Sequence, residues 1–277
     1  MARERAQVAL AVVEAHGDEA DVMITERPGH ARELVKAAVL RGARLVMAWG
    51  GDGTINEVAS ALVFNDVPLG IIPAGSGNGL ARELGVRLKP ELAIADALAA
   101  EPRLMDVGEI EGRYFVNIAG IGFDAHVASQ FNTPGNQRRG LLGYVRISFR
   151  ALRSYLPGVY RISHTGGSTE RRAILVTVAN SAQFGNGARI APGAKVDDGW
   201  LDLVVVEERS RWRTLMQLPR LFNGTVQRIP GCTIDRIQRA TIESDAPMTF
   251  HVDGEPVVGG TRLRVRLHPG ALWVVIK

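Results

Sequence analysis

The chain has 277 residues, 46% hydrophobic and 22% charged, a balance typical of a folded globular protein and not of a disordered one. Its formal net charge of +4 is too small for this length to indicate a nucleic-acid partner, and its single cysteine, Cys232, excludes an internal disulfide. The six histidines are not spaced as zinc ligands, no apolar run reaches the roughly 18 residues that span a bilayer, and the start lacks a signal-peptide pattern.

Helices and strands alternate through residues 1–103, which predicts an α/β domain with a parallel sheet. The chain opens in a helix, whereas such a domain normally opens with a strand, so we expect the first strand to be missing. The apolar spacing predicts helices over 2–16, 29–42, 54–63, 76–85 and 90–101, and strands over 22–25, 44–49 and 68–75.

The pattern changes at Leu104, after which short apolar runs are separated by glycine turns. This predicts a β-rich second domain over 104–277, in which strands joined by short glycine turns fill residues 104–125. Two helices are expected to interrupt it, one over 140–156 and another within 210–224.

Three glycines surround Asp52 between a buried strand and a helix, in the stretch GGDGTINEV (50–58). Glycines at the start of a helix let a phosphate approach backbone N–H groups and the positive end of the helix dipole. The stretch is neither a dinucleotide fingerprint, because Asn56 replaces the third glycine, nor a Walker loop. A plain tight turn is the alternative.

The carboxylate of Asp52 would repel a phosphate unless a cation intervenes or the carboxylate orients a hydroxyl, so a magnesium nucleotide is the expected ligand. A second loop of the same kind, PAGSGNGLA (73–81), follows the next strand and carries Ser76. Loops at the ends of adjacent parallel strands form the crevice where ligands bind in open α/β sheets.

These two motifs, GGDGTINEV and PAGSGNGLARELG, resemble the diacylglycerol kinase and sphingosine kinase family, in particular its bacterial YegS-like lipid kinases. The resemblance extends along the chain through TERPGHA (25–31), MDVG (105–108), NIAGIGFDA (117–125), KVDDGWLDL (195–203) and HVDGEP (251–256). It implies an ATP-dependent kinase that phosphorylates a hydroxyl of a membrane lipid. It also implies a three-layer, NAD-kinase-like nucleotide-binding domain over 1–103, an all-β sandwich-like domain over 104–277, and nucleotide bound in the cleft between them.

Carried over by motif, the resemblance implies a set of nucleotide contacts: Thr25, Gly50, Gly51, Asp52, Gly53, Thr54, Ile55, Asn56 and Ser76. Glu255 of the DGE motif matches the proton acceptor, and Asp106 matches a further active-site acid. A structural Mg²⁺ would be held by the side chain of Asp198 and by the backbone carbonyls of Lys195 and Trp200. Whether Glu255 or Asp52 takes the proton stays open, and DGE and DDG are also ordinary hairpin turns.

Two features depart from the family pattern. The sequence does not begin with the strand and N-P-x-S-G loop that usually open the chain, so either the start is truncated or the protein functions without them. A lost strand exposes the edges of its neighbours, which favours aggregation or pairing into an oligomer such as a homodimer. The GSGNG loop lies nearer the sphingosine-type pattern than the diacylglycerol type, so the lipid is left unspecified. Two other functions stay open, an NAD kinase-like enzyme and a nucleotide- or lipid-binding protein with impaired catalysis.

The expected helix over 140–156 is amphipathic. Arg146, Arg150 and Arg153 share one face, preceded by Arg138 and Arg139, and Leu142, Val145, Phe149, Leu152 and Leu156 share another. This suits peripheral contact with an anionic membrane, although packing on the sandwich would give the same pattern. The expected location is the cytoplasm, at the inner face of the membrane.

Overall fold

The computed structural model describes residues 2–131, 151, 155–210, 213 and 216–277, and the chain divides into two compact units. The first unit is formed by Met1–Met105 together with Gly270–Lys277, and the second by Asp106–Pro269. The return of the last residues to the first unit was not anticipated from the sequence. The arginine-rich helix expected over 140–156 falls almost entirely outside the described residues.

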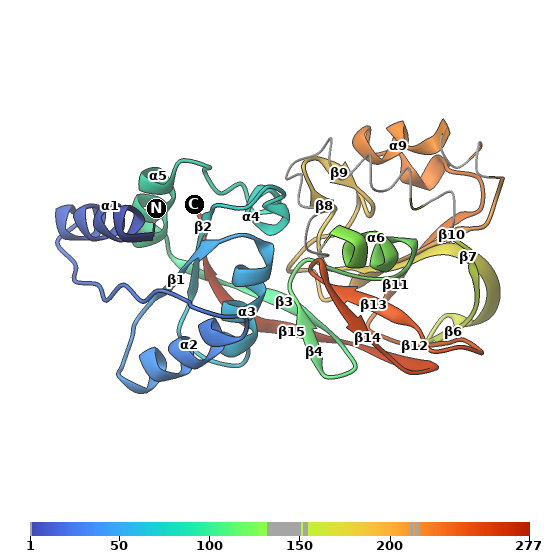
Figure 1. Cartoon of the computed structure of the whole chain (residues 1–277), viewed down its shortest axis with the longest axis horizontal. Coiled ribbons are helices and arrows are strands. Elements are labelled where there is room, and N and C mark those ends of the chain that lie inside the picture. The colour runs from blue at the N-terminus through green and yellow to red at the C-terminus, as the bar shows by residue number, and fades with distance from the viewer. Residues whose placement is uncertain (1, 132–150, 152–154, 211–212, 214–215) are drawn as a thin grey trace. The chain divides into compact units, whose positions relative to one another are not determined.

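The first unit is a three-layer α/β structure, in which helices lie on both sides of the parallel strands β1 and β2 (Figure 1). Helices α1 and α5 pack against one another on one side, and α2 packs against α3 on the other. Its elements are α1 (Ala2–Ala15), α2 (His30–Leu40), β1 (Val46–Gly50), α3 (Asp52–Leu62), β2 (Leu69–Pro73), α4 (Gly79–Glu83) and α5 (Pro90–Ala99).

The expected strand over 22–25 is wrong. The residues between α1 and α2 have no regular structure, and Val22, Met23 and Ile24 are exposed. β-branched residues favour a strand only where a neighbouring strand accepts their backbone hydrogen bonds, and no such neighbour exists among the described residues. In that same part of the chain β1 pairs with β2 alone.

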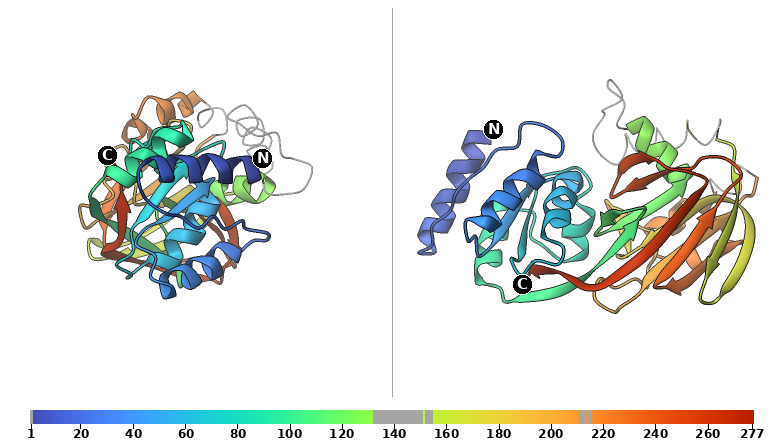
Figure 2. Two further views of the ribbon diagram at one scale, coloured as in Figure 1. Left: turned by 90° about the vertical axis from the view of Figure 1, so that its left-hand side faces the viewer. Right: turned by 90° about the horizontal axis from the view of Figure 1, so that it is seen from below.

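The second unit is built mainly from antiparallel strands. Strand β7 is central, because it pairs with β5, β6 and β10. Figure 2 shows the β6–β7 hairpin in yellow beside β12 in orange, in agreement with the pairing of β6 with β12. The strands are β3 (Pro102–Ile110), β4 (Arg113–Phe115), β5 (Ile118–Gly122), β6 (Gly158–His164), β7 (Gly167–Ala179), β8 (Gln183–Gly185), β9 (Ala188–Arg189), β10 (Leu201–Glu207), β11 (Cys232–Ile237), β12 (Arg239–Glu243), β13 (Thr249–Val252), β14 (Glu255–Val258) and β15 (Arg262–Val275).

Alternation along the central strands buries both of their faces. Ala119, Ile121, Val176 and Val178 contribute to the large apolar core of the unit, and their neighbours in sequence point to the opposite face. Helix α6 (Phe123–Phe131) packs against β5, β7 and β13. Strands were expected to continue to residue 125, and this is wrong for residues 123–125, which begin α6.

Helix α9 (Pro219–Phe222) lies within residues 210–224, where a second interrupting helix was expected, and the 3-10 turn η1 (Val226–Arg228) follows that region. Pro219 stands at the first position of α9, where a residue without an N–H group is tolerated. In the described part of the chain, no helix has both the length and the hydropathy needed to span a bilayer.

Candidate active site

The glycine turn lies between β1 and α3. Gly51 precedes the first helical residue, Asp52, so the amides of Asp52, Gly53 and Thr54 belong to the first helical turn, where N–H groups have no partner inside the helix. A Cβ at Gly50 would lie 2.5 Å from Cβ of Thr54. Close packing thus accounts for Gly50, while anion binding at the half-buried helix start stays a prediction.

The loops after β1 and β2 brace one another. The amide of Ala74 donates to the carbonyl of Gly50 at 2.8 Å, and a Cβ at Gly75 would lie 2.7 Å from Cα of Gly51. Oδ1 of Asp52 accepts a hydrogen bond of 2.7 Å from the amide of Gly79, the first residue of α4. Asp52 therefore joins the two loops, a role that the sequence analysis did not consider.

The predicted nucleotide contacts lie in different environments. Thr25 and Ser76 are exposed, whereas Ile55 is 0% exposed and Asn56 is 8% exposed. The side chains of Ile55 and Asn56 are packed inside the unit, so only their backbone could reach a ligand.

The DGE motif forms the turn between β13 and β14. Val252 pairs with Glu255, and the two residues between them have positive φ, 49° at Asp253 and 90° at Gly254, which is a type I′ hairpin. The buried carboxylate of Asp253 accepts the amides of Val116, Asn117 and Ile118 at 2.8 to 3.0 Å. Glu255 is exposed, so of the two acids in the motif it is the one that a substrate could meet.

A buried pair that the sequence analysis missed lies behind this turn. Nε2 of His251 lies 3.3 Å from Oδ2 of Asp124, and both side chains are 5% exposed. Oδ2 of Asp124 also accepts the hydroxyl of Thr177 at 3.2 Å. The available signal was a single carboxylate inside the apolar, glycine-rich run IAGIGFDAHVA.

The second predicted acid, Asp106, lies on β3 and is 3% exposed. Its Oδ2 accepts the amide of Gly199 at 2.7 Å, and its own amide donates to the carbonyl of Val196 at 2.7 Å. These bonds tie Asp106 to the KVDDGW loop. Its contact with a substrate stays a prediction.

The predicted structural Mg²⁺ site was compared with the geometry of the KVDDGW loop. Oδ2 of Asp198 is paired with the guanidinium of Arg236, which also lies over the ring of Trp200, and Oδ1 accepts the amide of Trp200 at 3.2 Å. No group of three or more acidic, histidine or cysteine side chains among the described residues is placed to hold a metal ion. Oxygen donors of this kind suit Mg²⁺, and in this arrangement the guanidinium of Arg236 neutralises the carboxylate that would face the cation. The Mg²⁺ site, with the backbone carbonyls of Lys195 and Trp200, stays a prediction.

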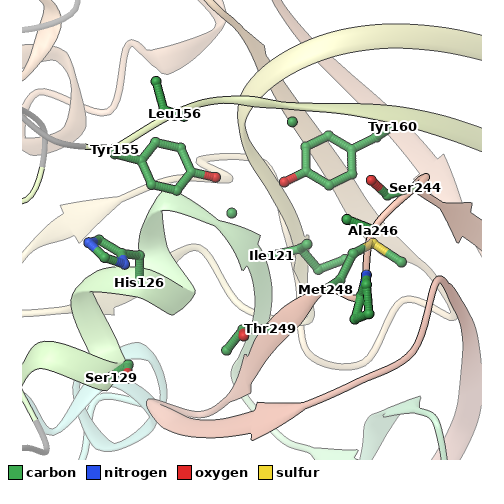
Figure 3. A pocket seen from close by; sticks show the side chains of 13 residues that line it. Ile121, His126, Ser129, Tyr155, Leu156, Tyr160, Ser244, Ala246, Met248 and Thr249 are labelled. Atoms are coloured by element: carbon green, nitrogen blue, oxygen red, sulfur yellow. The ribbon is translucent and has the colours of Figure 1, made fainter.

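A pocket of about 290 Å³ opens in the second unit, beside α6 (Figure 3). The hydroxyls of Tyr155 and Tyr160 point toward one another across it, and burial raises the pKa of both groups, so both stay protonated at neutral pH. The lining combines hydroxyl, imidazole and apolar side chains, among them His126, Ser129, Ile121, Leu156, Met248 and Thr249.

Comparison with known proteins covers nearly the whole chain. Residues 1–110 match the family described as diacylglycerol kinase catalytic domain, and residues 117–276 match the YegS C-terminal NAD kinase beta sandwich-like domain. A relative named "Probable lipid kinase YegS-like" from Chromohalobacter salexigens is 31% identical over 255 residues, 91% of this chain and 82% of the relative.

Two solved structures share the fold. A diacylglycerol kinase from Bacillus anthracis str. Sterne aligns with a TM-score of 0.74 at 20% identity, over 98% of this chain and 91% of that one. An NAD kinase from Archaeoglobus fulgidus, solved in complex with ATP, aligns with a TM-score of 0.56 at 12% identity, over 98% and 89%. The fold class predicted from the sequence is confirmed, and the chain belongs to the diacylglycerol kinase family of phosphotransferases, in its YegS-like lipid kinase branch.

Proposed function

We propose that this chain transfers the γ-phosphate of MgATP to a hydroxyl of a membrane lipid, diacylglycerol-like or sphingoid. The observation that carries the proposal is the pair of braced loops at the carboxyl ends of β1 and β2, where ligands bind in open α/β sheets. An anionic phosphate chain suits backbone amides at the start of α3. The NAD kinase neighbour that was solved with ATP supports the choice of nucleotide.

In this proposal the main role of Asp52 is to hold the two loops after β1 and β2 together. A carboxylate that accepts the amide of Gly79 at 2.7 Å is held by the protein, and this favours a positioning role over proton transfer. The Mg²⁺ of this reaction enters with the nucleotide as part of the substrate, and Thr25 and Ser76 are the exposed side chains proposed to contact it or the nucleotide.

Glu255 is proposed as the proton acceptor for the lipid hydroxyl. Phosphoryl transfer needs a carboxylate that can orient or deprotonate the acceptor, and such a group must be accessible to the substrate. In the DGE motif Asp253 is buried and accepts three amides, whereas Glu255 is exposed at the start of β14. These environments support Glu255 over Asp52 as the proposed proton acceptor.

The pocket beside α6 is proposed to bind part of the acceptor lipid. Its 290 Å³ lies at the lower end of the range of ligand pockets, enough for a segment of a lipid. Apolar side chains such as Ile121 and Met248 suit hydrocarbon, and the hydroxyls of Tyr155 and Tyr160 suit polar groups. Peripheral contact with an anionic membrane, a cytoplasmic location and a homodimer remain predictions.

The test is transfer of radioactive phosphate from labelled ATP to diacylglycerol, monoacylglycerol, sphingosine, ceramide or undecaprenol dispersed in detergent, with NAD as a further acceptor. We expect one lipid class to be labelled and Glu255→Gln to abolish the labelling. Glu170→Gln, which removes an exposed carboxylate from β7, is the matched control. Labelling of NAD alone would indicate the NAD kinase-like alternative, and nucleotide binding without labelling would indicate impaired catalysis.

A further inference from the structure

The turn that presents Glu255 is held from behind by a row of residues on three paired strands. In the register of the sheet Gly120 of β5 lies opposite Thr177 of β7 on one side and opposite His251 of β13 on the other. Cross-strand partners share a face, so the three positions face the same side of the sheet. This is the face opposite the apolar core that contains Ala119, Ile121 and Phe250.

Gly120 leaves a notch in this row, and the carboxylate of Asp124 fills it. A Cβ at Gly120 would lie 1.7 Å from Oδ2 of Asp124 and 2.7 Å from Nε2 of His251, so no other residue fits there without displacing the pair. Oδ1 of Asp124 accepts the amide of Ala125 at 2.8 Å, which fixes the carboxylate at the start of α6.

The hydrogen bonds of His251 assign its proton. Nδ1 accepts the amide of Gly254 at 3.2 Å, so the neutral ring carries its proton on Nε2, and Nε2–H donates to Asp124. A neutral imidazole has one N–H group, so when that group donates to a carboxylate the other ring nitrogen can only accept a hydrogen bond. His251 thus connects Asp124 with Gly254, the residue directly before Glu255.

We infer that Asp124 and His251 are positioning residues that orient the Asp253–Gly254 turn and hence the Glu255 carboxylate. The turn is fixed on its other side by Asp253, which accepts three amides of residues 116–118. A carboxylate carried on an exposed hairpin end gains a defined direction only from such supports. The inference rests on the proposed function, because it assigns Glu255 the reacting position.

Two substitutions of His251 separate its two hydrogen bonds. The amide oxygen of His251→Asn can replace Nδ1 and still accept from Gly254, whereas the longer His251→Gln places its amide near Nε2 and loses that bond. We expect His251→Gln to lower kcat by about 10- to 100-fold, the cost of a reacting group misplaced by about 1 Å, and His251→Asn to retain more activity. The KM for MgATP should not change in either variant.

His164 supplies the matched control. Its Nδ1 accepts the amide of Gly166 at 3.1 Å in the exposed β6–β7 hairpin, the same kind of contact without a catalytic acid beside it. We expect His164→Gln to leave kcat unchanged.

The variant Asp124→Asn tests the position of the His251 proton. ¹⁵N NMR of the His251 ring nitrogens should show the Nε2–H form in the wild type and a smaller share of that form in Asp124→Asn.

The outcomes separate the two claims. If Glu255→Gln abolishes lipid phosphorylation while His251→Gln and Asp124→Asn keep the wild-type kcat, the positioning role is wrong and the proposed function stands. If the wild type phosphorylates no lipid, the proposed function fails and the positioning role fails with it. Unchanged thermal unfolding and MgATP binding in the variants would show that a loss of kcat does not come from misfolding.

Discussion

Asp202 lies on β10 with 7% of its surface exposed, and its burial has a consequence for stability. Desolvation raises the pKa of this carboxyl above its ordinary value of 3.8, although Arg236 opposes the shift. The unfolded chain therefore releases this proton more readily than the folded one. The stability contributed by the protonated form is present below pH 3.8 and is lost as the pH rises through the raised pKa.

The variant Asp202→Asn should reveal this loss. Asn is neutral at every pH and close in size, so the variant should gain stability relative to the wild type as the pH rises from the acid range to neutrality. Urea unfolding at a series of pH values measures the difference. Asp235→Asn, at an exposed position on neighbouring β11, controls for removal of a carboxylate. A difference that stays constant with pH, or shrinks as the pH rises, would contradict the expectation.

Motifs in the sequence indicated Glu255 as a candidate but not the buried polar contacts that hold its turn. Asp253 accepts amides 135 to 137 positions away, and Asp124 meets a histidine 127 positions away. Such partners are adjacent only after the strands pair. Gly120 shows the same limit, because the need for glycine arises from Asp124 above it and not from its own backbone angle.

Helices were predicted more accurately than strands because their signal is local. The spacing that predicted a helix over 29–42 is confirmed by α2 at His30–Leu40, with Ala31, Val35 and Ala38 buried on one face. The strand expected over 22–25 does not form, because no neighbouring strand among the described residues pairs with it. Helix α6 was missed because it follows β5 directly, at Gly122, whose φ of 97° turns the chain without a polar loop.

The KVDDGW loop allows a test of the predicted cation site. Replacing Arg236 with Gln removes the cation that pairs with Asp198, at an intrinsic cost below about 1 kcal/mol because the guanidinium is 54% exposed. Mg²⁺ should then raise the melting temperature of Arg236→Gln by more than that of the wild type, because the freed carboxylate binds it better. Thermal unfolding with Mg²⁺ or with EDTA measures both increments.

Arg239→Gln removes the same charge from an exposed position on β12 and should behave as the wild type does. Equal Mg²⁺ increments in Arg236→Gln and the wild type would show that the guanidinium does not compete with a cation. A large increment in the wild type itself would show that Mg²⁺ displaces Arg236.

The first unit is built from segments at both ends of the chain. The alternation of helices and strands predicted the α/β character of the first unit, but nothing local in ALWVVIK indicates that it joins that unit. Strand β15 pairs with β12 near its beginning and with β2 at its end, where Val274 lies opposite Leu69. The amide of Phe64, two residues after α3, donates to the carbonyl of Ala271 at 2.8 Å.

Leu272 tests this contribution, because it is 0% exposed and lies in the returning segment. Leu272→Ala should lower the free energy of unfolding by about 2–5 kcal/mol, the transfer and cavity cost of a buried leucine. Val258→Ala, at a position 85% exposed, should change it by less than about 0.5 kcal/mol. Hydrogen exchange localises the effect, since the amides of β2 should lose protection first. Loss of protection confined to strands of the second unit would show that the end of the chain does not stabilise the unit that carries the glycine loops.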